Sequence, residues 1–165
     1  KDVAANISQE GILQAINLAN DALRLAGKKY PIIAVAALNP HAGDNGKFGR
    51  EEIDILEPAI AKAQANKINV TGPWPSDTIF LKAKRGEVDA IVTMYHDQGQ
   101  IAIKLLGFER GVTLAGGLPI PVATPAHGTA FDIAGKNEAN VSATRQAFDL
   151  LVSMAMMHRT DRDVT

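Results

Sequence analysis

A histidine and an aspartate stand side by side where an apolar run ends. The run from 90 to 94 gives way to Tyr95-His96-Asp97-Gln98-Gly99. A neutral imidazole offers a nitrogen lone pair near neutral pH, so a histidine beside a carboxylate suits metal ligation or proton transfer. The same residues also fit an ordinary helix start, in which Asp97 accepts backbone N–H bonds and His96 is only adjacent. This window alone supports both interpretations equally.

Two further histidines follow candidate strands. His41 lies in Asn39-Pro40-His41-Ala42-Gly43-Asp44, after an apolar run, and His127 follows the extended segment 122–124. The carboxyl ends of parallel strands meet at one edge of a sheet, so residues distant in sequence can converge there. His41 and His96 each have a carboxylate nearby and are the better candidate metal ligands. Two histidines are fewer than the three protein ligands usual for catalytic zinc, and each could instead bond its own loop backbone.

The segment from His127 to Ala130 has a different chemical character. Its small residues, Gly128, Thr129 and Ala130, let backbone N–H groups approach a flat or anionic ligand. Asp132 could accept a hydrogen bond from a ribose 2′-hydroxyl and would repel a 2′-phosphate. Gly-x-Gly-x-x-Gly and P-loop signatures do not occur in the sequence, which disfavours the nucleotide sites that they mark.

Lys104 follows His96 by eight residues, which is about two turns of a helix. A lysine near a metal could bind an anionic substrate or carry a proton. A lysine on a solvated helix face is the commoner case, and both interpretations remain open.

Alternating helices and strands are predicted to position these residues. Strands or extended segments are expected at 30–38, 68–70, 90–94, 111–114 and 122–124, with Gly72-Pro73-Trp74-Pro75 ending the second of them. Helices are expected from Ser8 to Gly27, from 49 to about 66 with a kink at Pro58, from a cap at Ser76 or Asp77 to about 85, after His96, and from Ser142. This alternation indicates an α/β fold with a largely parallel sheet flanked by helices.

Composition fits one ordinary α/β region across 1–165, with 46% hydrophobic and 21% charged residues. The formal charge of −1 gives no field for nucleic acid or an anionic membrane, and no apolar run reaches the roughly 18 residues of a membrane span. Cysteine is absent, which excludes disulfides and thiolate metal sites and suits the cytoplasm. Any metal must therefore use histidine, carboxylate or carbonyl ligands.

Four stretches, taken together and in order, resemble the 4-hydroxythreonine-4-phosphate dehydrogenase family over nearly the whole chain. They are Leu38-Asn39-Pro40-His41-Ala42-Gly43, Gly72-Pro73-Trp74-Pro75-Ser76-Asp77-Thr78, Met94-Tyr95-His96-Asp97-Gln98-Gly99 and His127-Gly128-Thr129-Ala130. The segment from His127 to Gly135 also resembles the adenosine-binding loop of isocitrate and isopropylmalate dehydrogenases, whose fold the family shares. The resemblance implies that fold here, with this chain as the C-terminal half and the family's third metal-binding histidine just before residue 1.

The resemblance also implies an activity. It is the NAD-dependent, divalent-metal-dependent oxidation of a hydroxy acid at its CH–OH group, with decarboxylation, in pyridoxine biosynthesis. The implied metal is zinc, magnesium or cobalt held by His41 and His96, and the implied assembly is a homodimer with the site shared across its interface. Lys104 matches the family's substrate lysine, and Asp77 and Asp97 are candidates for orienting ligands or relaying protons. NAD is expected at His127, Gly128, Thr129, Ala130, Asp132 and Asn140, the last of which matches an adenine contact.

Two positions depart from the family pattern. The family's substrate asparagine falls on Thr113 and its substrate arginine on Val122, and valine cannot replace the guanidinium that clamps phosphate or carboxylate. A sibling dehydrogenase acting on a dihydrodiol carboxylate or another hydroxy acid is therefore an alternative. A second alternative is an inactive fragment that only folds and dimerises. An isopropylmalate-type enzyme is disfavoured, because those enzymes coordinate metal with aspartates.

Overall fold

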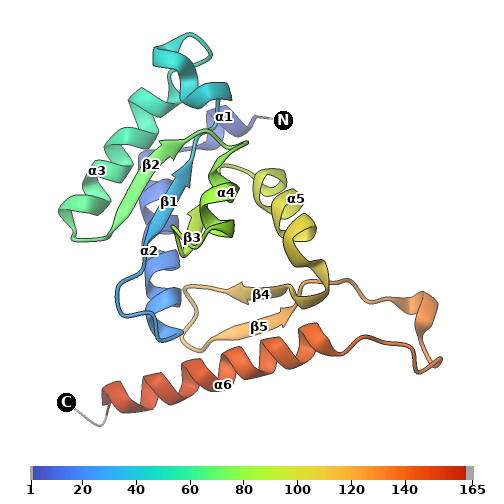
Figure 1. Cartoon of the computed structure of the whole chain (residues 1–165). Helices are drawn as coiled ribbons and strands as arrows, with labels where there is room; N and C mark the ends of the chain where they lie inside the picture. Colours follow the sequence, from blue (N-terminus) through green and yellow to red (C-terminus); the bar gives the residue numbers. More distant parts are fainter. Residues whose placement is uncertain (1, 163–165) are drawn as a thin grey trace. The chain divides into compact units, whose positions relative to one another are not determined.

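The apolar run after Tyr30 forms the centre of a three-stranded parallel sheet. This strand, β1 (Ile33–Ala36), is buried along its whole length and lies between β2 (Val70–Trp74) and β3 (Ala90–Val92) (Figure 1). Ile33 is in register with Val70 on one side and with Ala90 on the other. The predicted parallel sheet is therefore confirmed, and the carboxyl ends of its three strands lie at the same edge.

Helices cover both faces of this sheet, and β1 divides its side chains between them. Ile33 and Val35 face a core built with α2 (Gln9–Leu25) and α3 (Glu57–Ala65). Ala34 and Ala36 face Ile79 of the short helix α4 (Ile79–Lys84). Large side chains on one face and alanines on the other let the two helical layers approach the sheet at different depths.

The first long helix begins where the sequence predicts. The Ser8 hydroxyl accepts a hydrogen bond from the Gly11 amide at 3.1 Å, as an N-cap residue does, and α2 follows a short helix α1 (Val3–Asn6). The helix expected from residue 49 instead starts with a wide π turn, Glu52–Leu56, and continues as α3. Pro58 is the second residue of α3 and follows this wide turn, so its missing N–H falls inside the continuous helical stretch.

The second strand differs from its prediction, because β2 runs through Gly72-Pro73-Trp74 instead of ending there. The Gly72–Pro73 bond is cis, and Gly72 has a φ of 137°. A Cβ at Gly72 would lie 2.6 Å from the Val35 carbonyl oxygen, so the backbones of β1 and β2 approach more closely than any other residue allows. Pro73 is tolerated because β2 is an edge strand whose register with β1 shifts at this point.

The third sheet strand and the turn after β2 also differ slightly from expectation. β3 is shorter than the apolar run that predicted it, and α5 (His96–Gly107) begins directly at His96. Thr78, rather than Ser76 or Asp77, is the N-cap residue of α4, and its hydroxyl donates to the Pro75 carbonyl at 3.3 Å.

Beyond α5, the chain forms a hairpin packed on a long helix. A 3-10 turn, Phe108–Arg110, leads into β4 (Val112–Ala115), which pairs with β5 (Val122–Pro125) in antiparallel fashion. After a second 3-10 turn, Phe131–Ile133, the helix α6 (Ser142–Arg162) packs on both strands and buries Ala143, Ala147 and Met154. The predicted extended segments and the terminal helix are confirmed. The two extended segments pair with each other in an antiparallel sheet and do not join the parallel one.

The computed structural model describes residues 2–162, and the chain divides into two compact units. The first takes in α1 to the start of α5, and the second takes in the rest of α5 to α6 together with residues 25–27. The single α/β region over 1–165 stays a prediction. Among the described residues, no helix combines the length and the apolar character that crossing a membrane requires.

One ion pair ties together the starts of β1 and β3. The Asp89 carboxylate lies 2.7 Å from the Lys28 ammonium and accepts the Ile32 backbone N–H at 2.9 Å. The Lys28 hydrogen bond, followed by the Ile32 bond, lowers the pKa of Asp89 from its ordinary value. An aspartate with a lowered folded-state pKa stabilises the fold above its unfolded pKa of about 3.9, and that contribution disappears as pH falls through the folded value.

Replacing Asp89 with asparagine is therefore expected to have a pH-dependent effect. At pH 7 the free energy of unfolding should fall by about 1 kcal/mol, the usual net value of such a hydrogen bond. Below the folded-state pKa, the parent has lost the same contribution, so the two proteins should converge. Urea denaturation followed by circular dichroism at both pH values measures this. A difference that stays constant with pH would contradict the role of the charge.

Candidate active site

Three polar loops leave the same edge of the parallel sheet. His41 follows β1, His96 follows β3 and Asp77 follows β2, and β1 lies between the other two strands. All three side chains belong to exposed residues of the first unit. The parallel order therefore brings together the strand ends that carry three of the predicted site residues.

Gln98 ties two of these strand ends to each other. Its side-chain amide donates to the Ala37 carbonyl at 2.9 Å and accepts the Met94 backbone N–H at 2.8 Å. Ala37 is the residue after β1, and Met94 lies just before α5. One half-buried side chain thus fixes the turn that bears His96 against the end of the strand that leads to His41.

His96 is paired with its own neighbour. Its Nδ1 lies 2.7 Å from Asp97 Oδ1, and both side chains are largely exposed. With the proton on Nδ1 donated to the carboxylate, the ring's Nε2 keeps its lone pair, which is the usual arrangement of a metal-binding histidine. In the described part of the chain, the Asp97 carboxylate contacts this ring and not the backbone of α5, so it does not act as the helix cap considered above.

His41 lies in a turn of unusual backbone conformation. The 3-10 segment Pro40–Gly46 has six consecutive residues with positive φ, namely His41, Ala42, Gly43, Asp44, Asn45 and Gly46. Such a φ is uncommon for residues other than glycine, and it costs roughly 1–2 kcal/mol for a residue such as Ala42. The His41 ring lies 6.0 Å from the Phe48 ring, measured between centroids. We call the segment 41–45 the left-handed turn.

A buried glutamate lies against this turn. Glu52 is 1% exposed, and its carboxylate accepts the backbone N–H groups of Leu38 at 2.9 Å and Asn39 at 2.8 Å. The Asn39 side-chain amide also donates to it at 2.9 Å and to Glu51 at 2.6 Å. This amide bond lowers the pKa of Glu51 from its ordinary value.

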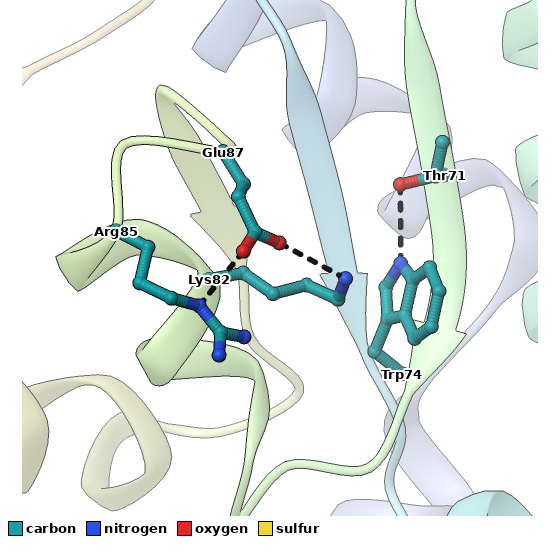
Figure 2. A network of polar contacts seen from close by, with 5 residues as sticks. All are labelled: Thr71, Trp74, Lys82, Arg85 and Glu87. Atoms are coloured by element: carbon teal, nitrogen blue, oxygen red, sulfur yellow. Dashed lines mark hydrogen bonds and ion pairs between the residues drawn. The ribbon is translucent and has the colours of Figure 1, made fainter.

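The third loop is anchored by a network at the end of β2 (Figure 2). The Lys82 ammonium lies 4.1 Å from the centroid of the Trp74 ring and 3.3 Å from Glu87 Oε2. The Trp74 indole N–H donates to the Thr71 hydroxyl at 3.1 Å, and Arg85 pairs with Glu87 at 2.7 Å. Cation–π contact with Lys82 fixes the indole just before the turn that carries Asp77.

The predicted nucleotide residues all lie in the second unit. His127, Gly128, Thr129, Ala130, Asp132 and Asn140 are exposed, and the segment is a loop leading into a 3-10 turn. The expectation that His127 ends a strand of the parallel sheet is wrong, because β5 belongs to the antiparallel hairpin. The His127 ring bonds its own loop, with Nδ1 2.9 Å from the Gly128 carbonyl, and the Asn140 side chain accepts the Ser142 N–H at the start of α6.

The substrate candidates of this unit lie on α5 and on one face of the hairpin. Lys104 is exposed in the last turn of α5. Thr113 pairs with Thr124, and Ala115 pairs with Val122, so Thr113 and Val122 are diagonal neighbours on the exposed face. Diagonal residues of an antiparallel pair lie roughly 7–8 Å apart, close enough to contact one small ligand.

The donor set of the first unit fits two positions of a divalent-metal site. His41 and His96 supply imidazole nitrogens, a donor type suited to zinc and cobalt, and Asp97 orients one of the rings. The described residues contain no group of three or more histidine, aspartate or glutamate residues that could hold an ion together. A complete site therefore needs donors beyond these two.

Sequence analysis did not identify the residues that fix these loops. Nothing in the sequence marks Gln98 as important except that it lies two residues after His96. Glu52 does carry a signal, since the residues four, seven, eight and eleven positions after it are the buried Leu56, Ala59, Ile60 and Ala63. Helical spacing therefore puts this carboxylate on the apolar face.

Comparison with known proteins finds clear similarity in both sequence and fold. Residues 1–151 match the family model described as pyridoxal phosphate biosynthetic protein PdxA. A Pseudomonas aeruginosa relative, provisionally named 4-hydroxythreonine-4-phosphate dehydrogenase 2, is 61% identical over 156 residues, which are 93% of this chain and 46% of that protein.

Two crystal structures extend this similarity to the fold. The 4-hydroxythreonine-4-phosphate dehydrogenase of Klebsiella pneumoniae superimposes with a TM-score of 0.82 at 43% identity, over 93% of this chain and 46% of that one. The terephthalate 1,2-cis-dihydrodiol dehydrogenase of Burkholderia xenovorans gives 0.67 at 32% identity, over 92% and 48%. The chain thus spans about half the length of the relatives that it matches.

Proposed function

This chain belongs to the family of pyridoxal phosphate biosynthetic protein PdxA, and we propose that it contributes the metal-binding and nucleotide-binding residues of a cytoplasmic dehydrogenase in that family. The reaction is the NAD-dependent oxidation of a hydroxy acid at its CH–OH group, with decarboxylation where a carboxylate lies β to the new ketone. The observation that carries the proposal is the Gln98 clamp, which fixes the His96 turn against the strand end leading to His41.

Residues of the first unit hold the reacting end of the substrate. His41 and His96 would hold a divalent ion through their ring nitrogens, and Asp97 would keep the proton of His96 on Nδ1 so that Nε2 retains its lone pair for the ion. When bound, the ion lowers the pKa of the substrate hydroxyl, and NAD⁺ accepts the hydride. In this scheme Asp77, which is exposed in the turn after β2, relays the released proton to solvent.

Residues of the second unit hold the rest of the reactants. Exposed backbone N–H groups of 128–130 suit the nucleotide, Asp132 accepts the ribose 2′-hydroxyl and excludes a 2′-phosphate, and Asn140 contacts the adenine. Lys104 binds the substrate's anionic group. Among the described residues, the exposed hairpin positions are Thr113, Ala115, Val122 and Thr124, so valine stands where the family's arginine would supply a guanidinium.

The substrate class has two candidates within one chemistry. Relatives named for 4-hydroxythreonine 4-phosphate favour a phosphorylated hydroxy acid. The similarity to a terephthalate cis-dihydrodiol dehydrogenase, together with valine at 122, favours a dihydrodiol carboxylate. The two differ in charge and in shape at the group that Lys104 and the hairpin face bind.

The working form is a homodimer with the site shared across its interface. In the second unit, α6 exposes the apolar side chains of Phe148 (66%) and Val152 (36%), which lie one turn apart, while its opposite face covers the hairpin. Leu105 of α5 is 83% exposed. Apolar surface of this kind is typical of a surface that is covered by another chain.

The proposal is tested by assaying the natural full-length protein with both substrate classes. Stripped of metal and then supplied with Zn²⁺, Mg²⁺ or Co²⁺, it should form NADH from 4-hydroxythreonine 4-phosphate or from a cis-dihydrodiol carboxylate. NADP⁺ should be the poorer acceptor because of Asp132, and sedimentation should give twice the monomer mass. Failure to reduce NAD⁺ with any hydroxy acid, with or without metal, would leave the protein without dehydrogenase activity and reject the proposal.

A further inference from the structure

The left-handed turn that carries His41 is not stable by its own sequence. Four of its five residues are not glycine, and all five have φ between 42° and 80°. Two backbone bonds lead back into the turn from the residues just after it, Lys47 N–H to the Asp44 carbonyl at 3.3 Å and Phe48 N–H to the Gly43 carbonyl at 3.2 Å. Positive φ at four residues other than glycine is strained, so contacts outside the turn must hold its conformation.

Glu52 provides such contacts at both the entry and the middle of the turn. At the entry, Oε1 accepts the N–H groups of Leu38 and Asn39, which link β1 to the turn. In the middle, a Cβ added to Gly43 would lie 2.7 Å from Glu52 Oε2, so the carboxylate contacts the turn backbone directly. Gly43 is itself buried.

The chemistry of this contact requires a carboxylate. A buried charge is costly unless hydrogen bonds satisfy it, and here three N–H donors do so. An apolar side chain would fill the same space but would leave the Leu38 and Asn39 N–H groups unpaired. A glutamine would keep one oxygen acceptor but would present its own N–H₂ group to the Asn39 amide, which is also a donor.

We propose that Glu52 is a positioning residue that holds the left-handed turn so that the His41 imidazole is presented to the metal. The inference rests on the proposed role of His41 as a ligand. Glu52 touches neither metal nor substrate, and it acts through the backbone of 38–43. Its loss therefore changes how the ion is bound, in addition to any change in stability.

The test compares Glu52→Gln with Glu57→Gln in the natural full-length protein loaded with Co²⁺. Glu57 is an exposed glutamate in the same helical stretch, so its variant controls for the change of charge and residue type. Three quantities are measured: Co²⁺ affinity, the visible absorption of bound Co²⁺, which reports ligand geometry, and hydrogen exchange of the Leu38 and Asn39 amides. Glu52→Gln should lower Co²⁺ affinity by about 10–100-fold, as loss of a residue that orients a ligand does, shift the spectrum and speed exchange. Glu57→Gln should change none of these.

A His41→Ala variant separates the two possible failures. If His41→Ala weakens Co²⁺ binding but Glu52→Gln leaves affinity and spectrum as in the control, Glu52 has no positioning role and this inference is wrong. If His41→Ala itself leaves Co²⁺ binding unchanged, the metal assignment of the proposed function fails and the inference fails with it. Should Glu52→Gln not fold, Asn39→Ala replaces it, because it removes one donor to Glu52 and leaves the two backbone bonds intact. Asn39→Ala should change the three quantities in the same direction by a smaller amount. If none of the three changes, the inference is wrong.

Discussion

Replacing His96 with alanine is expected to abolish metal-dependent NADH formation by the natural full-length protein. The imidazole Nε2 of His96 is one of the two proposed metal donors, and alanine offers no lone pair in its place. Losing a residue that merely orients a ligand costs about 10–100-fold in metal affinity, so losing the ligand should cost more than about 100-fold. Asp97→Asn should give the intermediate effect, because it removes the carboxylate 2.7 Å from His96 Nδ1 but leaves the ring in place.

His127→Ala is the matched control, since it removes an exposed histidine from the second unit. Calorimetric titration with Zn²⁺ and with NAD⁺ should separate the two variants. His96→Ala should lose Zn²⁺ binding and keep NAD⁺ binding, whereas His127→Ala should weaken NAD⁺ binding and keep that of Zn²⁺. A His96→Ala protein that binds Zn²⁺ like the parent and still forms NADH would rule out the metal assignment.

Replacing Gly72 with alanine is expected to destabilise the fold by about 3–5 kcal/mol. The backbone strain of a φ of 137° costs on the order of 1–3 kcal/mol, and relieving a Cβ that lies 2.6 Å from the Val35 carbonyl oxygen adds about 1–3 kcal/mol. A domain of this size is stable by about 5–15 kcal/mol, so the loss is at least about a fifth of the total. Urea denaturation followed by circular dichroism gives the difference.

Gly86→Ala separates the two contributions. Gly86 also has a positive φ, of 72°, but an added Cβ there would meet no atom within 4 Å. Its alanine variant should lose only about 1–2 kcal/mol, the cost of a left-handed residue. If the two variants unfolded at the same urea concentration, the close approach of β1 and β2 at Gly72 would make no contribution to stability.

Features set by local chemistry were predictable from the sequence. The Ser8 cap, the buried β1, the start of α5 beside His96 and the final helix all follow from periodicity and capping residues. The parallel sheet follows from the alternation of these elements, and with it the shared edge of His41, His96 and Asp77. Each of these features depends on a few neighbouring residues.

Features set by distant contacts were not predictable. Gly-Pro ordinarily ends a strand, and only the approach of Val35 explains why β2 continues through Gly72. Histidine, alanine and aspartate rarely adopt positive φ, so no local rule predicts the left-handed turn, whose support comes from Glu52 thirteen residues beyond Asn39. His127 follows a strand of the antiparallel hairpin and not of the parallel sheet. Hydrophobic periodicity predicts that a segment is extended, but it does not predict which other strand that segment pairs with.

The stacking of Lys82 on Trp74 has a practical consequence. Trp74 is the chain's only tryptophan, so its intrinsic fluorescence comes from one indole at the carboxyl end of β2. An ammonium group 4.1 Å from the ring centroid makes the emission sensitive to small movements of that contact. With 37% of the residue exposed, the indole is also accessible to a dissolved quencher. The chain thus contains a natural optical reporter at the sheet edge that bears His41 and His96, without any added label.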